Sequence, residues 1–264
     1  MDSLSIWVIL LLTTALVYLS VEVGYRMGAS SLQSNRNEKE SSVSATVGSV
    51  LGLTAFVLAF TFGIVYQRYD EKKDLVREEA TAIWTVHQRS DFLPEQDAQE
   101  VKGMLLKYAR LHTVLPAAIG KDHGKKGRNV EDVLNQTETI EKRLWAIAVK
   151  NSQSTSALDM VSMFADSLND MAVLEEMRIA ASIETRINGA IWLTLFILTF
   201  SGMVALGYQT GVSGSHRSKA SPILACSFGL VLTLISALDR PDTITVPQQP
   251  LFDVMRQMGA DSLR

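Results

Sequence analysis

The side chains that could do acid–base, nucleophilic or metal chemistry match no catalytic motif in their spacing. The four histidines are His87, His112, His123 and His216, and no two have the HExxH spacing that puts two zinc ligands on one helix. Cys226 is the single cysteine, so the chain can form neither a CxxC pair nor an intrachain disulfide. A metal site between His112 and His123 is the one alternative left open. The sequence predicts no enzyme, no metal site and no cofactor.

A basic stretch, "GKDHGKKGR" at residues 120–128, has some features of a phosphate-binding loop. Its spacing from Gly120 to Gly124 is one residue short of the GxxxxGK[ST] pattern, and Lys126 stands where serine or threonine is needed. No strand pattern precedes it. We interpret it as a solvated basic loop, with contact to an anionic lipid or a small anion as the alternative.

Four stretches of the chain are long and apolar enough to cross a bilayer, which takes about 20 predominantly apolar residues. They are residues 5–21, the stretch between Glu40 and Arg68, the stretch between Arg186 and His216, and residues 220–238. None carries a charge, which argues against proton-relay or ion-coupled transport. We interpret the first stretch as a retained helix because no basic segment precedes it. The sequence predicts an all-α polytopic membrane protein with four transmembrane helices.

A charged region between the second and third spans shows the apolar period of helices. Helices are predicted at 66–92, from Pro94 onward, at 130–150, and from Ser154 toward Gly189, where the last would run into the third span. The stretches 22–42 and 210–219 are predicted loops. The resulting divisions are 1–67 (two spans and their loop), 68–186 (a helical domain), 187–238 (two spans) and 239–264 (a tail).

The orientation follows from lysine and arginine near the span ends. An even number of spans puts both termini and the helical domain on one side of the membrane. That side carries the larger share of basic residues close to the spans, among them Arg68, Lys72, Lys73 and Arg77. We therefore expect a multi-pass protein of the inner (plasma) membrane, with both termini and the helical domain in the cytoplasm.

The second span has a small face and a bulky face. Small residues recur every three or four positions, which allows close helix packing; they include Gly48, Gly52, Ala55, Ala59 and Gly63. Bulky residues, among them Leu53, Phe56 and Phe60, lie on the remaining surface. Two interpretations stay open: the bulky face lies in lipid, or it meets its own copies and forms a hydrophobic constriction.

Residues 66–73, "YQRYDEKK", end this span. Tyr66 and Tyr69 suit the headgroup layer, and Arg68 can extend to the same level. Opposite charges then follow at helical spacing, as in Arg68 with Glu71. The pattern predicts that the second span leaves the membrane as one continuous helix.

The stretch "FTFGIVYQRYDEKK" resembles the bestrophin signature, in which a phenylalanine-bearing pore helix ends in tyrosine, arginine, an aromatic residue and glutamate. The matching positions are Phe60, Tyr66, Arg68, Tyr69 and Glu71. The segment "LDRPDTITVPQQPL", with Asp239, Arg240 and Pro241, resembles the tail of the bestrophin-like domain family of mainly bacterial membrane proteins. The order of spans and helical region is similar as well.

This resemblance implies a homo-oligomer, in bestrophins a pentamer, that lies in the lipid bilayer and passes small anions. Its second span would line the pore, with Phe56 and Phe60 at a neck and Leu53 as a further pore residue. Asp70 departs from the signature, which has a second aromatic residue there, and no acidic cluster for calcium sensing follows the last span. Nucleic acid is not an expected partner. The alternative function is a non-conducting membrane scaffold or sensor whose cytoplasmic helices bind a partner.

Overall fold

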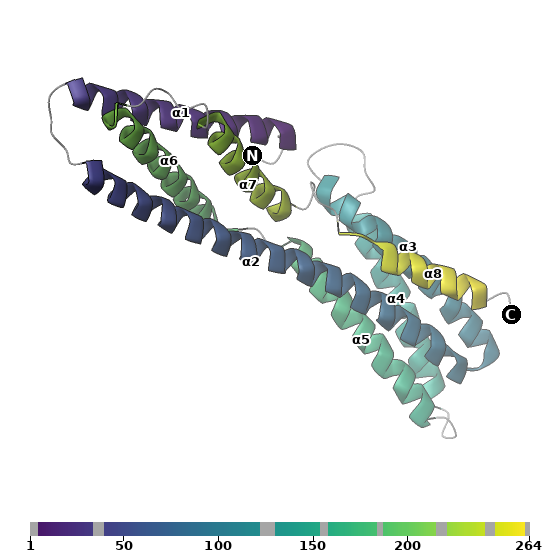
Figure 1. Cartoon of the computed structure of the whole chain (residues 1–264). Coiled ribbons are helices and arrows are strands. Elements are labelled where there is room, and N and C mark those ends of the chain that lie inside the picture. The colour runs from purple at the N-terminus through teal and green to yellow at the C-terminus, as the bar shows by residue number, and fades with distance from the viewer. Residues whose placement is uncertain are drawn as a thin grey trace. The chain divides into compact units, whose positions relative to one another are not determined.

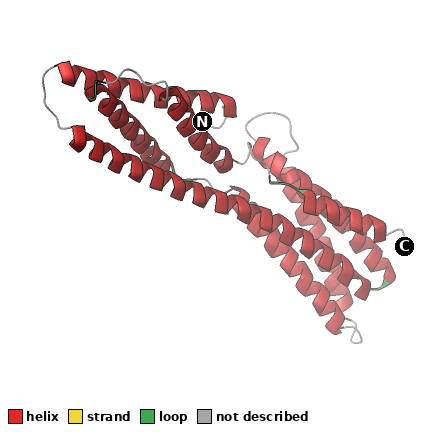
Figure 2. Cartoon of the chain, in the orientation of Figure 1, coloured by secondary structure: helices red, strands yellow, loops and turns green. Residues whose placement is uncertain are grey.

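The computed structural model describes residues 5–33, 40–121, 130–153, 158–183, 187–214, 221–240 and 246–261. Within these ranges the chain is almost entirely helical, and none of them forms a strand (Figure 2). The helices are α1 (Ile6–Gln33), α2 (Glu40–Arg89), the short 3-10 helix η1 (Ser90–Phe92), α3 (Glu95–Lys121), α4 (Val130–Ser152), α5 (Leu158–Ile183), α6 (Gly189–Val212), α7 (Ser221–Asp239) and α8 (Gln249–Asp261). The predicted all-α fold is confirmed.

Four of these helices, α1, α2, α6 and α7, are long and apolar enough to span a membrane. They correspond to the four predicted spans, with one correction. The loop expected from residue 22 begins later, because α1 continues to Gln33. Glu22 and Arg26, which lie in the predicted loop, form an ion pair at 2.8 Å across one helical turn. Such an i,i+4 pair supports a helix and does not end it.

The fourth central helix does not run into the third span, contrary to the prediction. Helix α5 ends at Ile183, and Ile187 and Asn188 are not helical. Asn188 has φ −57° and ψ 136°, and its side chain accepts a hydrogen bond from Ala190 N at 3.0 Å. Asn188 is therefore an N-cap, and α6 begins as a separate helix. Ser154, the expected start of the fourth helix, lies outside the described residues.

The chain divides into two compact units. We call residues 1–67 with 186–243 the membrane unit, because it contains the apolar parts of α1, α2, α6 and α7. Residues 68–185 with 244–264 form the helical unit. The division falls inside α2, whose residues up to Gln67 belong to the membrane unit and whose charged remainder belongs to the helical unit.

In the membrane unit, α1 lies alongside α6 and α7 (Figure 1). Val17 of α1, Met203 of α6 and Ala225 of α7 are buried together. Thr13 Oγ1 lies 3.4 Å from Thr233 Oγ1, which adds a polar contact between α1 and α7. Small and hydroxyl side chains at such contacts are typical of helix packing in membranes.

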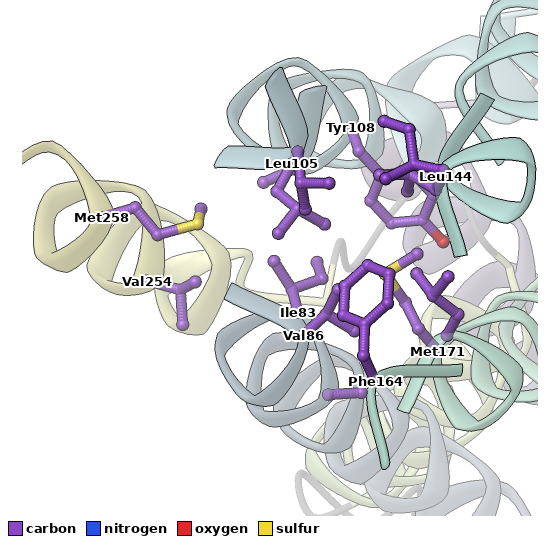
Figure 3. Packing of buried hydrophobic residues seen from close by; sticks show 14 of the residues in the cluster. Ile83, Val86, Leu105, Tyr108, Leu144, Phe164, Met171, Val254 and Met258 are labelled. Carbon is purple, nitrogen blue, oxygen red and sulfur yellow. The ribbon is translucent and has the colours of Figure 1, made fainter. Parts of the chain in front are cut away.

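The helical unit has its own core, to which α2, α3, α4, α5 and α8 contribute (Figure 3). Fully buried side chains include Ile83 of α2, Tyr108 of α3 and Phe164 of α5. Val254 and Met258 of α8 belong to the same cluster. Residues 239–264 are predicted to form a tail, and α8 within this range packs against α3 as part of this core.

Candidate functional site

One face of α2 carries three bulky apolar side chains that remain largely uncovered. Leu53 is 52% exposed, Phe56 69% and Phe60 63%. Spacings of three and four residues put these side chains on one face of the helix. The Phe56 and Phe60 rings stack with their centroids 6.4 Å apart. We call Leu53, Phe56 and Phe60 the α2 row.

The opposite side of α2 packs within the membrane unit, and this packing decides where the α2 row points. Leu58 and Val65 are buried in a cluster that includes Leu195 of α6. Thr54 Oγ1 also donates a hydrogen bond to the carbonyl oxygen of Leu198 at 3.2 Å. The α2 row therefore faces away from α6.

Chemically, the α2 row can exclude water, lie against lipid or contact another apolar surface. It offers no acid, base or nucleophile. No group of three or more side chains able to hold a metal ion occurs in the described parts of the chain. A row of this kind fits the hydrophobic constriction considered from the sequence, and it fits a lipid-facing surface equally well.

The glycines of α2 have open space beside them in the described part of the chain. A Cβ atom added at Gly48, Gly52 or Gly63 would meet no described atom within 4 Å. Ala55 and Ala59 line an apolar cavity of about 430 Å³ between α2 and α7. Close helix packing along these five residues stays a prediction.

Residues 66–71 lie on an uninterrupted helix, because α2 is continuous from Glu40 to Arg89. This confirms that the second span continues into the charged region without a break. Tyr66 is exposed and its ring stacks on Phe62 at 6.1 Å. Lys73 Nζ forms an ion pair with Asp70 at 3.1 Å and lies 5.9 Å from the centre of the Tyr69 ring. Arg68 is half-buried and Glu71 is exposed.

Asp239, the first residue of the tail motif, ties the end of α7 to the start of α6. One carboxylate oxygen accepts from Ile187 N at 2.9 Å, and the other accepts from Trp192 Nε1 at 3.2 Å. Asp239 thus satisfies a backbone donor at the approach to α6 and orients the Trp192 ring. Arg240 is half-buried, and Pro241 lies outside the described residues.

A family model, described as the bestrophin-like domain, matches residues 11–242. This range covers the four spans and most of the helical unit. The chain belongs to the bestrophin-like family. The resemblance predicted from the residues around Tyr66 and Asp239 is therefore confirmed.

The fold of this bestrophin-like chain is also similar to a solved structure. It matches the crystal structure of a mutated bacterial bestrophin homolog from Klebsiella pneumoniae with a TM-score of 0.63 and 15% sequence identity. The match covers 95% of this chain and 97% of that chain. No curated protein matches this chain. At this identity the likeness establishes the shared fold.

A buried polar network in the helical unit of this bestrophin-like chain was missed from the sequence. Glu79 of α2 pairs with His112 of α3 and Arg178 of α5, and all three residues are buried. Arg178 also donates to the His112 carbonyl oxygen at 3.0 Å and to Gln248 Oε1 at 2.5 Å. The network therefore joins three helices to the segment that leads into α8.

The charge of Glu79 is set by its neighbours. Burial alone would raise its pKa, but the hydrogen bond from His112 and the charges of His112 and Arg178 outweigh burial and hold the pKa of Glu79 below its usual value. The sequence contains a signal that could have revealed this buried carboxylate, because Glu79 is a charged residue within a stripe of apolar residues at helical spacing. Val76 and Ile83, which lie three residues before and four after Glu79, are both buried.

A second carboxylate lies close by on α5. Glu175 accepts a hydrogen bond from the Tyr108 hydroxyl at 2.9 Å, and the Tyr108 ring stacks on His112 with centroids 4.2 Å apart. Burial, followed by the charge of Glu175, raises the pKa of Tyr108 well above its usual value, so the phenol remains a donor. His112, considered from the sequence as a metal ligand together with His123, belongs to this network; His123 lies outside the described residues.

Proposed function

We propose that this bestrophin-like chain forms a homo-oligomeric channel for small anions, with the α2 row lining the pore. The observation that carries the proposal is the exposure of Leu53, Phe56 and Phe60 on a membrane-spanning helix whose other side is packed. Several copies of such a row around an axis would form an apolar constriction, and narrow apolar constrictions control ion passage by expelling water. The pentameric state carried by the family resemblance is part of this proposal.

The small face of α2 supports an oligomer. Gly48, Gly52 and Gly63 leave open space beside the helix, into which a neighbouring copy could pack closely. We also propose, from the distribution of lysine and arginine, that the helical unit and both termini lie on the cytoplasmic side of the inner (plasma) membrane. Catalytic activity is not part of the proposal.

The first prediction is that Phe60→Ala raises anion conductance. Removing the ring from every copy would widen the constriction and shorten the part of the pore from which water is expelled. The measurement is anion flux into liposomes that contain purified wild-type protein or the variant at equal density. The matched control is Leu11→Ala on α1, because Leu11 is 70% exposed but lies outside the proposed pore. Its flux should equal that of the wild type.

Phe62→Ala is a second control on α2 itself. Phe62 is half-buried, lines the cavity with α7 and stacks on Tyr66. Its truncation should therefore reduce stability and leave the width of the proposed pore unchanged. Flux at background level from wild type, Phe60→Ala and Phe62→Ala, each folded and oriented, would contradict the channel. A purified protein that is monomeric in detergent would also argue against the proposed pore.

A second candidate function is a non-conducting scaffold or sensor whose helical unit binds a partner. It is favoured by exposed apolar side chains on α5, which are Met160, Met163, Val173 and Met177. Val173 also lines a groove of about 590 Å³ between α2 and α5, whose walls are both charged and apolar. Anion flux at background level, together with a monomeric protein in detergent, would favour this function over the channel.

A further inference from the structure

The groove between α2 and α5 of the helical unit has the size of a small-molecule site. Helix α5 runs beside the charged part of α2 (Figure 1), and the two helices form the walls of the groove. We call this space, of about 590 Å³, the α2–α5 groove. Sites for small molecules typically have volumes of about 300–1,000 Å³ and combine apolar walls with a few polar groups. The lining of this groove contains carboxylates, hydroxyl groups and apolar side chains.

Each wall of the α2–α5 groove contributes one carboxylate. Glu78 belongs to α2 and Asp170 to α5, and both residues are exposed. Neither carboxylate has a hydrogen-bond or ion-pair partner among the described residues. The lining also contains Arg77, whose Nη1 donates to Asp74 at 2.9 Å. With Asp74 included, three carboxylates stand against one guanidinium, so the groove has an excess of two negative charges.

The hydroxyl groups of the groove can accept hydrogen bonds from a ligand, because their own protons are already used. Thr81 Oγ1 donates to the Arg77 carbonyl oxygen at 2.9 Å, and Thr85 Oγ1 donates to the Thr81 carbonyl oxygen at 2.9 Å. Ser167, which is buried, donates through Oγ to the Phe164 carbonyl oxygen at 2.7 Å. A hydroxyl has one proton and two lone pairs, so each oxygen remains an acceptor. The polar part of the lining therefore suits a ligand that donates hydrogen bonds.

Apolar side chains complete the lining of the groove and indicate what kind of cation fits it. Ala82 of α2 is buried, Leu174 of α5 is half-buried, and Val173 is exposed. A metal ion such as Mg²⁺ gains nothing from these side chains, because it takes a shell of oxygen ligands at fixed distances. An aliphatic chain can instead lie along them, which removes apolar surface from water. The groove therefore fits a cation that has an aliphatic body.

We propose that the α2–α5 groove binds a linear organic diamine or polyamine. One ammonium group pairs with Glu78 and another with Asp170, and the methylene chain between them lies against Val173 and Leu174. An ammonium group has three donors and no acceptor, which matches the acceptors of the lining. This inference does not depend on whether the protein conducts ions.

The two carboxylates set the expected strength of binding and its response to salt. Removing one of them leaves one ammonium group without its charged partner, which should weaken binding by about tenfold. Both carboxylates are exposed, so binding should also weaken as the salt concentration is raised.

The test is isothermal titration calorimetry of the full-length protein in an uncharged detergent at low ionic strength, with spermidine as the probe. We expect spermidine to bind wild type, and to bind Glu78→Gln and Asp170→Asn about tenfold more weakly. Each substitution removes a charge and keeps the size of an exposed side chain, and circular dichroism checks that the variants are folded. The matched control is Glu176→Gln, because Glu176 is exposed on α5 and is not part of the groove lining. Its affinity for spermidine should remain within about twofold of wild type.

Two further probes distinguish a site built for a polyamine from general attraction of cations to an acidic surface. Butylamine has one ammonium group on an aliphatic chain, and Mg²⁺ has two charges and no apolar body. We expect spermidine to bind more tightly than either probe. Equal affinity for spermidine and Mg²⁺ would overturn the proposal, and so would equal losses of spermidine affinity in Glu78→Gln, Asp170→Asn and Glu176→Gln. The absence of detectable spermidine binding to wild type would overturn it as well.

Discussion

At the scale of single residues, the arrangement of buried charges in the helical unit depends on Arg178. Its guanidinium is engaged by the Glu79 carboxylate, the His112 carbonyl and the Gln248 side chain. A buried pair of this kind adds little stability relative to an apolar pair of similar size. Removing one partner is costly, because it leaves the other charge buried and uncompensated.

We therefore predict that Glu79→Gln lowers the free energy of unfolding by about 3–5 kcal/mol. The matched control is Asp74→Asn on the same helix, because Asp74 and Arg77 form an exposed pair at 2.9 Å. Exposed pairs contribute about 0–1 kcal/mol. Thermal unfolding in detergent, followed by circular dichroism, measures both. Similar losses for the two variants would show that Glu79 is not a buried charge.

The contribution of Glu79 to stability has a pH dependence opposite to that of Glu141 on α4. Burial and the neighbouring Glu175 raise the pKa of Glu141. Because the pKa of Glu79 is lower in the folded state than its ordinary 4.5, its contribution is present above pH 4.5 and is lost as pH falls through the folded value. Glu141 contributes most at acidic pH and least above its folded value of about 8. Together, the two carboxyl groups favour the folded state most strongly on the acidic side of neutrality.

At the scale of helices, glycines let α1 and α6 pack with their backbones in close contact. Gly24 of α1 and Gly207 of α6 lie where a Cβ would clash with the backbone of the other helix. Gly28 and Gly211 repeat the arrangement one turn further on. Each helix thus carries a GxxxG pair at the crossing, and the absence of side chains lets the two backbones touch.

Gly207→Ala should push α1 and α6 apart and destabilise the membrane unit by about 1–3 kcal/mol, the usual range for overpacking. The clashing atoms are the Val21 carbonyl and Tyr25 N, which are backbone and cannot turn aside. Gly103→Ala on α3 is the control, since nothing lies within 4 Å of a Cβ there. It should raise stability by up to about 1 kcal/mol through helix propensity. Equal effects of the two changes on the unfolding temperature would contradict the close crossing.

At the scale of the whole molecule, the chain builds two separate cores, and its C-terminal helix completes one of them. Leu251 and Met258 of α8 are fully buried and Val254 nearly so. Gln248, just before α8, accepts from Arg178 in the polar network. Gln248 and α8 therefore belong to the packing of the helical unit.

Leu251→Ala should cost about 2–5 kcal/mol, as expected for a large-to-small change in a packed core. Its neighbour Phe252 provides the control, because its side chain is exposed and Phe252→Ala should alter stability by no more than about 0.5 kcal/mol. Protease susceptibility of the helical unit in the detergent-solubilised protein measures the difference. If both variants resist proteolysis as wild type does, α8 does not contribute to the core.

The number of spans and their places in the chain follow from the sequence without any knowledge of packing. Hydrocarbon excludes charges and requires about 20 apolar residues, so the uncharged stretches could be assigned without knowing their neighbours. The continuity of α2 across Tyr66 and Arg68 could also be predicted, because helical charge pairs are a local property. The start of α8 and the end of α5 could not be predicted in this way, because a single N-cap residue or apolar stripe is a weak signal when its packing partner is unknown.

Which helix faces are covered depends on contacts between distant parts of the chain. The periodicity of apolar residues shows that a helix has an apolar face, but the residues that cover this face can lie anywhere along the chain. Arg178 and Glu79 are 99 residues apart, and no spacing rule links them. Both GxxxG pairs of the α1–α6 crossing are visible in the sequence, as is the pair in α2, yet α2 leaves its glycines open. The pattern is the same in all three helices, and the contacts differ because backbone approach is set by the packing of the whole membrane unit.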